Sequence, residues 1–569
     1  MGVLRPMKTT ALETLDTGPS GTRVNDAIML DTPDDTAWDD ACDLLVVGCG
    51  LAGASAALKA AEDPNASIIV IDRFDGGGAS QQSGGVLYLG GGTRVQNEVG
   101  VSDTIESMVD YLSIETGNVV GRATLERFCK DSASMIPWLE RHGVHFGGPL
   151  TEAKTSYPGD EYLYYSGNER LLDSVRLAAP APRGHRVKPA AVAEGSKLSG
   201  QDLMTPLKHA LDRAANIQFQ RRTAASRLIL DRTRRVIGVE ARQIPPGSRA
   251  GALHKMLMQA NGNMTLAMLG ISRPLLQMAL AIERAVARIR RIRVRRGVVL
   301  STGGFAHNPR MLAEESPVYR HVTPLGTVGD DGSGIMLGHN AGGAVERLDT
   351  VSAWRFLYPP AGWSKGVLVG PDGTRFVNEE AYGARTGKAM FETAGGLGWL
   401  ILDQPMLETV QKQAKSRDLL AFQRMTIGAA LRFYSDHAPS IAELAAKVGL
   451  PPSALSATID DYNADIAAKR PDKLGKAPSL CTPIATGPFT AIDLSYRTRF
   501  HPLPGITVGG LKVDENDGHV LDRDGQPIAG LFAAGRTAVG LPSHLYVSGL
   551  SLADCVWSGW RAAKSALPK

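Results

Sequence analysis

Three glycines and one aspartate near the start of the chain have the types and spacing of a dinucleotide-binding site. Gly48, Gly50 and Gly53 stand in the order GxGxxG, and Asp72 follows at the distance of a ribose-binding acid. The first glycine permits a tight turn, the second lets the backbone approach a pyrophosphate, and the third lets a helix pack close to a strand. The pattern therefore predicts a bound dinucleotide, with its phosphates at a helix N-terminus.

The elements around this motif are those that a dinucleotide fold requires. Residues 44–47 read as a buried parallel strand, a small-residue helix follows the glycines, and residues 67–71 read as a second strand that ends in Asp72. Two more glycine segments recur far along the chain, GVVLSTGGF at 297–305 and GLFAAGR at 530–536. A nucleotide fold assembled from both ends of the chain implies that a further domain is inserted between them.

The loop after the acidic strand favours FAD over NAD. The segment GGGASQQSGGVLYLGGGT at 76–93 offers hydroxyls and amides that can line a flavin, although a flexible surface linker is the alternative. The recurrence of the glycine segments favours the cofactor site. The expected FAD-binding residues are Gly48, Gly50, Leu51, Ala52, Gly53, Asp72, Arg73, Ala79, Ser80, Ser83, Gly84, Gly85, Gly303, Gly304, Gly535, Arg536, Ser551 and Leu552.

Length and composition limit the remaining possibilities. A chain of 569 residues suggests two or three domains, and a net charge of +4 is too small to indicate a nucleic-acid partner. Five scattered cysteines without a CxxC pair indicate neither a disulfide framework nor a metal site, and favour a reducing cytoplasm. We expect no signal peptide and no membrane-spanning segment.

These observations predict an α/β protein. A Rossmann-like FAD-binding domain is assembled from residues 39–325 and 490–569, and an α+β substrate (capping) domain is inserted at residues 326–489. Residues 1–38 are polar and predict a flexible or loosely packed N-terminal arm. The first part of the FAD-binding domain carries a helical insertion at about residues 245–290, discussed below.

The ordered motifs resemble those of the fumarate reductase/succinate dehydrogenase flavoprotein superfamily. Within it the chain is most similar to the 3-ketosteroid dehydrogenases, above all the Δ4-(5α) type. The broader motifs are VVGCGLAGASAA, GVVLSTGGF, GDDGSGIMLGHNAGG, GTRFVNEEAYG and GGLKVD. The narrower ones are LYYSGNE at 163–169 and YVSGLSLADC at 546–555.

The chain departs from the diacid enzymes of that superfamily at both cationic anchors. Those enzymes carry His-Pro and Asn-Arg-Leu-Gly, since two carboxylates must be desolvated and paired. Here Tyr358-Pro359 and residues 545–548 stand in those places. A phenol and a serine suit a neutral ketone on a large apolar body, because they bury no permanent charge. The covalent flavin histidine is also missing from residues 80–85, so we expect noncovalent FAD.

The resemblance also implies roles for individual residues. Tyr546 is the expected base or proton relay, assisted by Ser548, and Tyr382 is a second active-site tyrosine. A free tyrosine has a pKa near ~10, so a phenol needs partners to act as a base. Tyr358 is expected to line the substrate pocket, and an amide near Gly549 to polarise the ketone.

The leading hypothesis is thus a FAD-dependent 3-ketosteroid dehydrogenase that forms the Δ4 double bond from a 5α-steroid. A Δ1-dehydrogenase is the nearest alternative, and a flavin-dependent enone reductase is another. A flavin-binding protein without turnover is the alternative from a different class. The sequence has no haem-attachment CxxCH and no iron–sulfur cysteine set. We therefore expect electrons to pass to an external acceptor, either a quinone or a carrier protein.

The insertion has two interpretations. Leu275, Met278, Ala279 and Ile282 recur at helical spacing, and seven arginines follow between Arg284 and Arg296. An apolar helix beside a basic cluster is typical of peripheral membrane contact, here through residues 245–296 on the inner face of the membrane. The alternative is a helical hairpin packed on its own domain or on another subunit.

Overall fold

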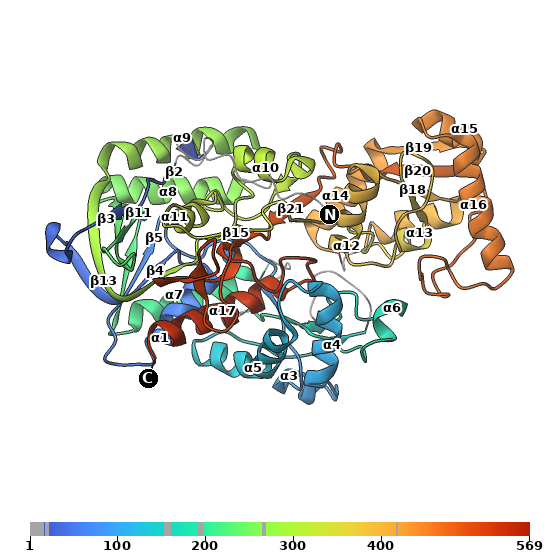
Figure 1. Ribbon diagram of the computed structural model, residues 1–569. Helices are drawn as coiled ribbons and strands as arrows, with labels where there is room; N and C mark the ends of the chain where they lie inside the picture. Colours follow the sequence, from blue (N-terminus) through green and yellow to red (C-terminus); the bar gives the residue numbers. More distant parts are fainter. Residues whose placement is uncertain are drawn as a thin grey trace.

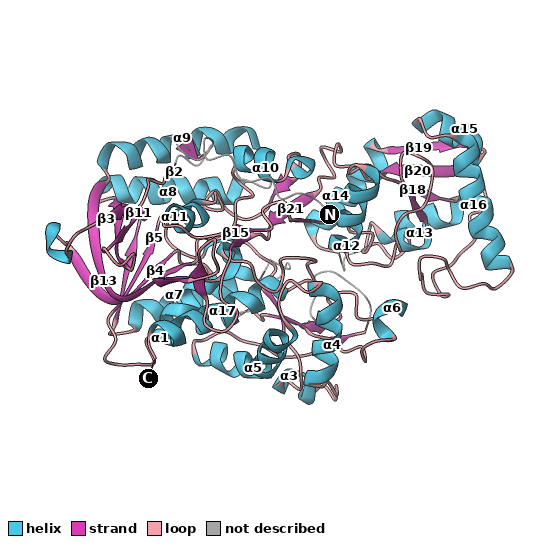
Figure 2. Ribbon diagram, in the orientation of Figure 1, coloured by secondary structure: helices cyan, strands magenta, loops and turns pink. Residues whose placement is uncertain are grey.

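The computed structural model describes residues 16–17, 22–152, 161–189, 199–264, 269–416 and 419–568. Figure 1 shows two lobes, one built around a large sheet and one around a smaller sheet that carries the labels β18 to β20. Figure 2 shows helices around the strands of both lobes. The arrangement is mixed α/β, as the sequence predicts.

The large sheet combines a parallel nucleotide-binding half with an antiparallel half. Its order is β10 (Ile217–Arg221), β5 (Ile68–Asp72), β4 (Asp40–Val47), β13 (Arg288–Leu300), β12 (Val236–Gln243), β11 (Thr223–Leu230) and β3 (Ile28–Met29). From β10 to β13 neighbouring strands are parallel, whereas β11, β12 and β13 are antiparallel. β24 (Pro527–Ala533) pairs parallel with β13, and β23 (His519–Leu521) pairs antiparallel with β24.

Both faces of this sheet are buried, which explains the near-continuous apolar run of β4. Successive side chains of a strand point to opposite faces. Leu44 and Val46 therefore belong to the core beneath the helices α1 (Leu51–Ala60) and α17 (Leu550–Ala566). Leu45 and Val47 belong to the core on the other face. A strand covered on both faces is expected in a parallel nucleotide-binding sheet.

The C-terminal segment completes the nucleotide-binding half. Phe532 of β24 lies opposite Val299 of β13 in the parallel register. α17 packs against α1 so closely that a Cβ on Gly559 would lie 2.5 Å from the carbonyl oxygen of Ala52. The two ends of the chain therefore form one structural unit, although they are far apart in sequence.

The smaller lobe is built on an antiparallel sheet. Its order is β17 (Val367–Val369), β18 (Trp399–Leu402), β20 (Phe489–Asp493) and β19 (Ser435–Ala438). The helices of this lobe are α12 (Gly383–Ala394), α13 (Gln404–Gln413), α14 (Ala421–Phe433), α15 (Ile441–Val448) and α16 (Pro452–Ala467). A separate apolar core contains residues from both the sheet and these helices.

The chain passes between the lobes through a small sheet. Its order is β14 (Thr323–Pro324), β21 (Pro504–Thr507) and β16 (Val351–Ala353). β20 pairs within the smaller lobe, and Leu337 of α11 (Ser333–Asn340) packs in the core of the large sheet. We therefore propose to place the limits of the capping domain near residues 345 and 503 rather than at 326 and 489.

The remaining strands form smaller sheets, and the remaining helices complete the larger lobe. A four-stranded sheet has the order β6 (Val86–Tyr88), β9 (Gly184–Arg186), β8 (Leu163–Tyr164) and β7 (Leu150–Thr151). Two-stranded pairs are β1 (Asp16–Thr17) with β2 (Thr22–Arg23), and β15 (Val345–Glu346) with β22 (Gly510–Leu511). The other α-helices are α2 (Gly78–Gln81), α3 (Arg94–Glu98), α4 (Ile105–Thr116), α5 (Arg122–Arg141), α6 (Leu172–Val175), α7 (Gly200–Arg213) and α10 (Pro309–Glu315). Short 3₁₀ turns occur at Pro33–Asp35, Pro317–Tyr319, Trp363–Lys365 and Gly535–Thr537.

Part of the predicted flexible arm is anchored. β3 pairs with β11, and the Trp38 Nε1–H donates a hydrogen bond to the Pro33 carbonyl at 2.6 Å. A Cβ on Gly238 would meet the Trp38 ring, so the ring lies against the sheet. Residues 28–38 are therefore attached to the sheet, which fits the loosely packed form of the predicted arm better than a flexible one. Residues 1–15 and 18–21 lie outside the described residues.

The insertion forms a helical hairpin of α8 (Arg249–Met264) and α9 (Leu269–Val286). Residues 265–268 lie outside the described residues. The predicted apolar stripe of α9 is buried only in part, since Ala279 is buried beside Leu276 and Leu280 whereas Met278 is 53% exposed. Within the described ranges, no helix combines the length and apolar character needed to cross a bilayer.

The arginines that follow the insertion lie mostly on β13, and several of them are paired. The pairs are Arg290–Asp40 at 2.9 Å, Arg291–Glu240 at 3.2 Å and Arg295–Asp43 at 2.8 Å. The acidic partners come from β4 and β12, which flank β13. Much of the basic cluster therefore serves internal strand-to-strand contacts, which favours the packing interpretation over membrane contact.

Candidate active site

The three glycines of the GxGxxG motif have different surroundings. Gly48 has φ +96°, and a Cβ there would lie 2.7 Å from the Ser301 carbonyl oxygen. A Cβ on Gly53 would lie 1.9 Å from the carbonyl oxygen of Gly48. A Cβ on Gly50 would meet only the Ser80 Oγ, at 3.8 Å. Packing thus requires the first and third glycines, whereas the second faces open space where a ligand can approach the backbone.

Two helix N-termini are available for electron-rich groups. Neither N-cap residue, Gly50 of α1 or Gly549 of α17, supplies a capping side chain, and at α1 the Leu51 amide instead meets the Ser80 Oγ. Gly559 of α17 lies beside Ala52 at the start of α1, and the segment from Gly549 to Gly559 is about 15 Å long at the usual helical rise. An extended dinucleotide can therefore use both N-termini, with its phosphates at α1 and another polar group at α17.

The two aspartates of the motif that begins GDDGSG have a role that the sequence pattern did not indicate. Asp330 Oδ1 lies 2.5 Å from Arg536 Nη2 and also accepts a hydrogen bond from the Gly304 amide at 3.3 Å. Asp331 Oδ2 lies 3.4 Å from Arg73 Nη1. The adjacent acids thus hold two predicted cofactor residues from opposite ends of the chain. The signal in the sequence was a pair of neighbouring acids inside a glycine-rich motif.

The pairing of Arg536 leaves one of its nitrogens for a ligand. The Arg536 Nη1 atom is buried and has no hydrogen-bond partner among the described residues. A buried donor without a partner is costly, so the site fits an acceptor that is not part of the chain. Together with the open side of Gly50 and the two helix N-termini, this orphan donor shows that the residues fit FAD.

Asp72 connects the glycine motif to the loop after β5. Its Oδ2 accepts from the Cys49 amide at 2.7 Å and its Oδ1 from the Phe74 amide at 2.8 Å. Burial raises the pKa of this carboxyl, and hydrogen bonds from the Cys49 and Phe74 amides oppose that effect. Asp72 therefore fixes the local backbone, while its contact with a ribose stays a prediction.

The loop at 76–93 divides between the cofactor site and a neighbouring segment. Ser80 Oγ accepts from the Leu51 amide at 3.2 Å, and Ala79 lies beside Gly326. Ser83 and Gly85 instead pack against the start of α7, where the Gly200 amide donates to the Ser83 carbonyl at 3.0 Å. The predicted cofactor contacts of Ser83, Gly84 and Gly85 therefore have less structural support than that of Ser80. Ser551 and Leu552 lie in the first turn of α17.

The structure brings the two predicted active-site tyrosines into one apolar cluster. Tyr382 is the N-cap of α12, and Tyr546 lies in the loop before α17. Tyr546 meets the Trp354 ring edge-to-face at 5.1 Å between centroids, and Tyr382 meets Phe356 in the same way at 5.6 Å. The cluster is completed by residues that include Ala384, Ile506 and Val508. Both phenols therefore lie in largely apolar surroundings.

Small residues allow this close approach of α12 to the segment after β16. A Cβ on Gly383 would lie 2.7 Å from the Phe356 ring, and one on Gly387 would lie 2.0 Å from the Ala353 carbonyl oxygen. The Trp354 Nε1–H is buried and has no hydrogen-bond partner among the described residues. The cluster thus contains an unused donor beside Tyr546, which the sequence analysis missed.

The narrow motif at 163–169 joins the two tyrosine-bearing segments. Asn168 Oδ1 accepts from the Tyr382 amide at 2.7 Å, and Ser166 Oγ donates to the Ser548 carbonyl at 3.0 Å. Asn168 Nδ2 donates to Glu115 Oε1 at 2.9 Å. The side chains of Ser166 and Asn168 therefore set the relative position of Tyr382 and Ser548. Sequence reasoning found this motif but assigned it no role.

Gly549 and Tyr358 lie near this cluster by position in the chain. Gly549 has φ +92°, and its carbonyl accepts from the Tyr88 amide at 3.0 Å. Tyr358 follows Phe356 by two residues and is partly buried, which raises the pKa of its phenol. Tyr358 is not among the described members of the apolar cluster. Its predicted contact with substrate therefore stays a prediction.

The cation nearest to Tyr382 in sequence is engaged elsewhere. Arg385 Nη2 lies 2.6 Å from Asp173 Oδ2 in a partly exposed ion pair. Arg385 therefore offers no evidence for recognition of a carboxylate substrate.

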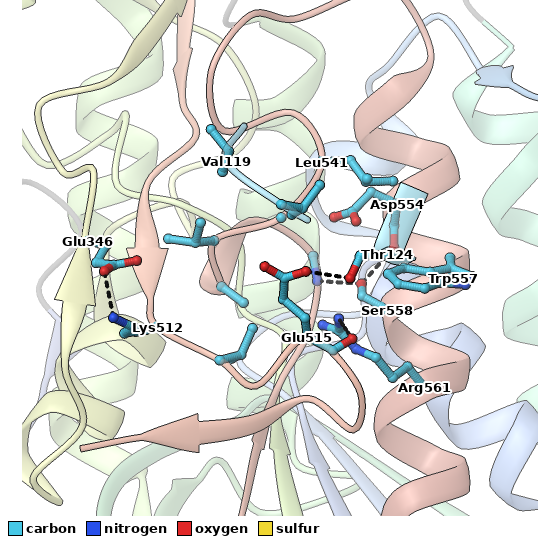
Figure 3. A pocket seen from close by; sticks show the side chains of 16 residues that line it. Val119, Thr124, Glu346, Lys512, Glu515, Leu541, Asp554, Trp557, Ser558 and Arg561 are labelled. Carbon is cyan, nitrogen blue, oxygen red and sulfur yellow. Dashed lines mark hydrogen bonds and ion pairs between the residues drawn. The ribbon is translucent and has the colours of Figure 1, made fainter. Parts of the chain in front are cut away.

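A separate pocket lies along α17 (Figure 3). Its lining includes Asp554, Arg561 and Glu515, and the Arg561 Nη1–H donates to the Glu515 carbonyl at 3.1 Å. Burial raises the pKa of the Asp554 carboxyl to about 6. Neither predicted tyrosine lines this pocket, so it is distinct from the aromatic cluster.

Comparison with known proteins defines the family. The FAD binding domain family matches residues 43–549, and the chain belongs to this family. The chain is 36% identical over 531 residues to the 3-oxo-5-alpha-steroid 4-dehydrogenase of Comamonas testosteroni, covering 90% of this chain and 96% of that protein. It is 26% identical over 570 residues to a 3-oxosteroid 1-dehydrogenase of Mycobacterium tuberculosis, covering 89% and 94%.

The structural comparison agrees. The crystal structure of the 3-ketosteroid-Δ4-(5α)-dehydrogenase from Rhodococcus jostii RHA1 in complex with 4-androstene-3,17-dione superposes with a TM-score of 0.78 at 29% identity. It covers 95% of this chain and 99% of that one. These findings confirm the predicted resemblance, the α/β fold with a capping domain, the FAD cofactor and the class of FAD-dependent oxidoreductase. Noncovalent attachment and the individual site residues stay predictions.

Proposed function

We propose that this protein dehydrogenates a 5α-saturated 3-ketosteroid and introduces a double bond between carbons 4 and 5. The observation that carries the proposal is the meeting of Tyr382 and Tyr546 in one apolar cluster. Similarity to the Comamonas testosteroni and Rhodococcus jostii enzymes supports the steroid and the position of the double bond. An apolar wall with phenols, and with no cation at the two positions of the diacid anchors, suits a neutral ketone better than a diacid.

The ketone acidifies the neighbouring carbon–hydrogen bond at carbon 4. Tyr546 takes or relays that proton, with Ser548 as its assistant, while Tyr382 helps to hold the ketone or to move the proton. A backbone amide at the start of α17, near Gly549 or Ser551, polarises the ketone oxygen. Bound FAD supplies the acceptor for the hydride that leaves carbon 5. The apolar rings around both phenols exclude water from the reacting carbons.

The residues that would hold FAD noncovalently surround the GxGxxG loop. The Gly50 backbone and the α1 N-terminus face the phosphates, and Arg536 offers its unpartnered Nη1. The first turn of α17, with Ser551 and Leu552, lies at the opposite end of the same space. No histidine occurs in residues 80–85, which supports noncovalent attachment.

Turnover with product identification tests the proposed reaction. The purified protein is incubated with a 5α-saturated 3-ketosteroid and an artificial electron acceptor, and the product is identified by mass spectrometry and NMR. A new double bond between carbons 4 and 5 is the expected result. A double bond between carbons 1 and 2 would identify the Δ1 activity instead. Reduction of an enone, with no dehydrogenation of any ketosteroid, would contradict the proposal.

We also propose that the electrons leave to a separate acceptor, either a quinone or a carrier protein. All five cysteines are unpaired and dispersed, and the sequence has no haem-attachment motif. Re-oxidation of the substrate-reduced enzyme by a soluble quinone should be faster than re-oxidation by dioxygen. Equal rates would argue against a quinone and leave the carrier protein.

For the insertion, we infer packing on its own domain rather than membrane contact. The paired arginines of β13 support this inference, since they leave less free basic surface. The protein should therefore not sediment with anionic vesicles at physiological salt. Cosedimentation would restore the peripheral membrane hypothesis. The cytoplasmic location stays a prediction.

A further inference from the structure

The α8–α9 hairpin buries polar side chains against the nucleotide-binding half. On α8 the buried positions include His254 and Leu257, and on α9 they include Leu276 and Leu280, followed one turn later by Glu283. Figure 1 shows both helices above the large sheet, on the side away from α1 and α17. A helix that directs an acid and an imidazole inward must satisfy them there, because unpaired buried polar groups are costly.

The residues that follow β5 meet both groups, although the His254 Nδ1 atom has no hydrogen-bond partner among the described residues. Glu283 Oε2 lies 2.9 Å from Arg73 Nη2, and His254 Nε2 lies 2.9 Å from Glu283 Oε1. The His254 ring stacks on Phe74 at 6.3 Å between centroids, with only 9° between the planes. Arg73 and Phe74 directly follow Asp72, the predicted ribose-binding acid. The hairpin therefore contacts the segment where the sequence predicts the adenosine end of the cofactor.

The charged form of Glu283 is favoured in its ion pair with Arg73, although the carboxyl is largely buried. Burial alone would raise the pKa of Glu283, but the nearby Arg73 and the hydrogen bond from His254 hold that pKa below its ordinary value. The Arg73 side chain is 10% exposed, and its ion pair with Asp331 is longer, at 3.4 Å. Glu283 thus lies nearer to this arginine than Asp331 does.

We propose that the α8–α9 hairpin is a latch that holds Arg73 and Phe74 in place and thereby sets the affinity for FAD. Glu283 and His254 act as positioning residues, through Arg73 and Phe74. A connected series of contacts links Phe74 to the GxGxxG loop, because the Asp72 carboxylate accepts hydrogen bonds from both the Cys49 and the Phe74 amides. The inference rests on noncovalent FAD binding and is independent of which substrate the enzyme oxidises.

The test is the FAD dissociation constant of Glu283→Gln. Glutamine keeps the shape and one acceptor oxygen but removes the charge that holds Arg73. The apoprotein is titrated with FAD and followed by flavin fluorescence, with Met278→Gln as the matched control. Met278 lies on the same helix and is 53% exposed. We expect affinity about tenfold weaker or more for Glu283→Gln, the scale of one charged hydrogen bond, and no change for the control.

A second measurement, on the holoprotein, tests the proposal even if the apoprotein of a variant does not refold. The rate of FAD release from the purified holoprotein is measured after dilution into an apo-flavoprotein trap, for Glu283→Gln and for His254→Gln. Both should release FAD faster than the unaltered protein, and kcat at saturating FAD should stay within about twofold. Unchanged affinity and release rate would overturn the proposal. A loss of kcat at saturating FAD with unchanged affinity would overturn it as well. Failure of every steroid to turn over would leave this readout intact.

Discussion

Buried acidic groups have different kinds of partner at the cofactor end and at the substrate end of the site. At the cofactor end, the acids Asp330 and Asp331 are paired with Arg536 and Arg73. At the substrate end, the buried Glu115 accepts hydrogen bonds from Asn168 and Tyr111, which are neutral. A charged cofactor needs a framework whose cations are held in fixed directions. A neutral ketone instead needs rings and phenols, which the aromatic cluster supplies.

The largest expected effect comes from removing the phenol at the substrate end. Tyr546→Phe should lower kcat by about 100-fold to 10,000-fold, the usual range for losing a general acid or base. The ring contact with Trp354 is kept, so the FAD content should equal that of the unaltered protein. Steady-state kinetics and the flavin absorbance ratio measure both quantities. A drop in FAD content that parallels the loss of rate would mean that Tyr546 serves cofactor binding rather than the chemistry at the substrate end.

A pair of glycine variants makes the same distinction at the cofactor end. Gly50 has φ −78°, which alanine adopts freely, and its Cβ would meet no atom closer than 3.8 Å. Gly50→Ala should therefore fold normally but bind FAD about 10-fold to 100-fold more weakly, because the methyl group occupies ligand space. Gly53→Ala should destabilise even the apoprotein, since its Cβ would lie 1.9 Å from a carbonyl oxygen. Fluorescence titration and thermal unfolding separate the two effects. Normal FAD binding by Gly50→Ala would contradict the inference that the cofactor approaches the backbone at Gly50.

The buried acid at the substrate end should make stability depend on pH. Burial raises the pKa of Glu115 from its ordinary value of 4.5 to about 7. The folded state thus binds this proton more tightly, so the contribution is present below pH 4.5 and is lost as the pH rises toward 7. Between these values Glu115 should lower the free energy of unfolding by at most about 1.4 kcal/mol per pH unit.

Urea unfolding of the apoprotein from pH 5 to pH 8 tests this contribution. Glu115→Gln keeps an acceptor for Asn168 and Tyr111 but cannot ionise, so its advantage over the unaltered protein should grow with pH. Asp554 also has a raised pKa, but its contribution is common to both proteins and cancels in their difference. A difference that does not vary with pH would mean that Glu115 titrates normally.

The smallest effect is expected at Arg385. This side chain pairs with Asp173 at the surface, where an ion pair contributes little. Arg385→Ala should leave kcat and KM within about twofold and FAD affinity unchanged. A loss of more than 100-fold in kcat would show that a cation serves the chemistry, and would reopen the diacid interpretation.

The same comparison explains what the sequence could predict. The GxGxxG residues are neighbours in the chain, so their local spacing carries the cofactor site and the packing of Gly48 and Gly53 could be inferred directly. The aromatic cluster unites Trp354, Tyr382 and Tyr546, which lie far apart in sequence. The family resemblance supplied the two tyrosines, but nothing in the local pattern indicated Trp354 as their partner.

The hairpin shows a second limit of sequence patterns. Apolar spacing on α9 placed Met278 and Ala279 on one stripe, but the structure buries Ala279 and leaves Met278 exposed. The polar residues His254 and Glu283 are buried because Arg73 and Phe74 receive them, and hydrophobic periodicity treats such residues as exposed. Long-range ion pairs, including those of Asp330 and Asp331, are invisible to that kind of pattern.

Anaerobic reduction of the bound flavin tests most directly the claim that both ends serve one reaction. The purified yellow protein is mixed without oxygen with a 5α-saturated 3-ketosteroid, or with the matching 3-hydroxysteroid, and the flavin absorbance band is followed. We predict rapid bleaching with the ketone, formation of the 4,5-double bond, and no bleaching with the alcohol. A flavin that no 3-ketosteroid bleaches, or that the alcohol bleaches equally fast, would contradict the account.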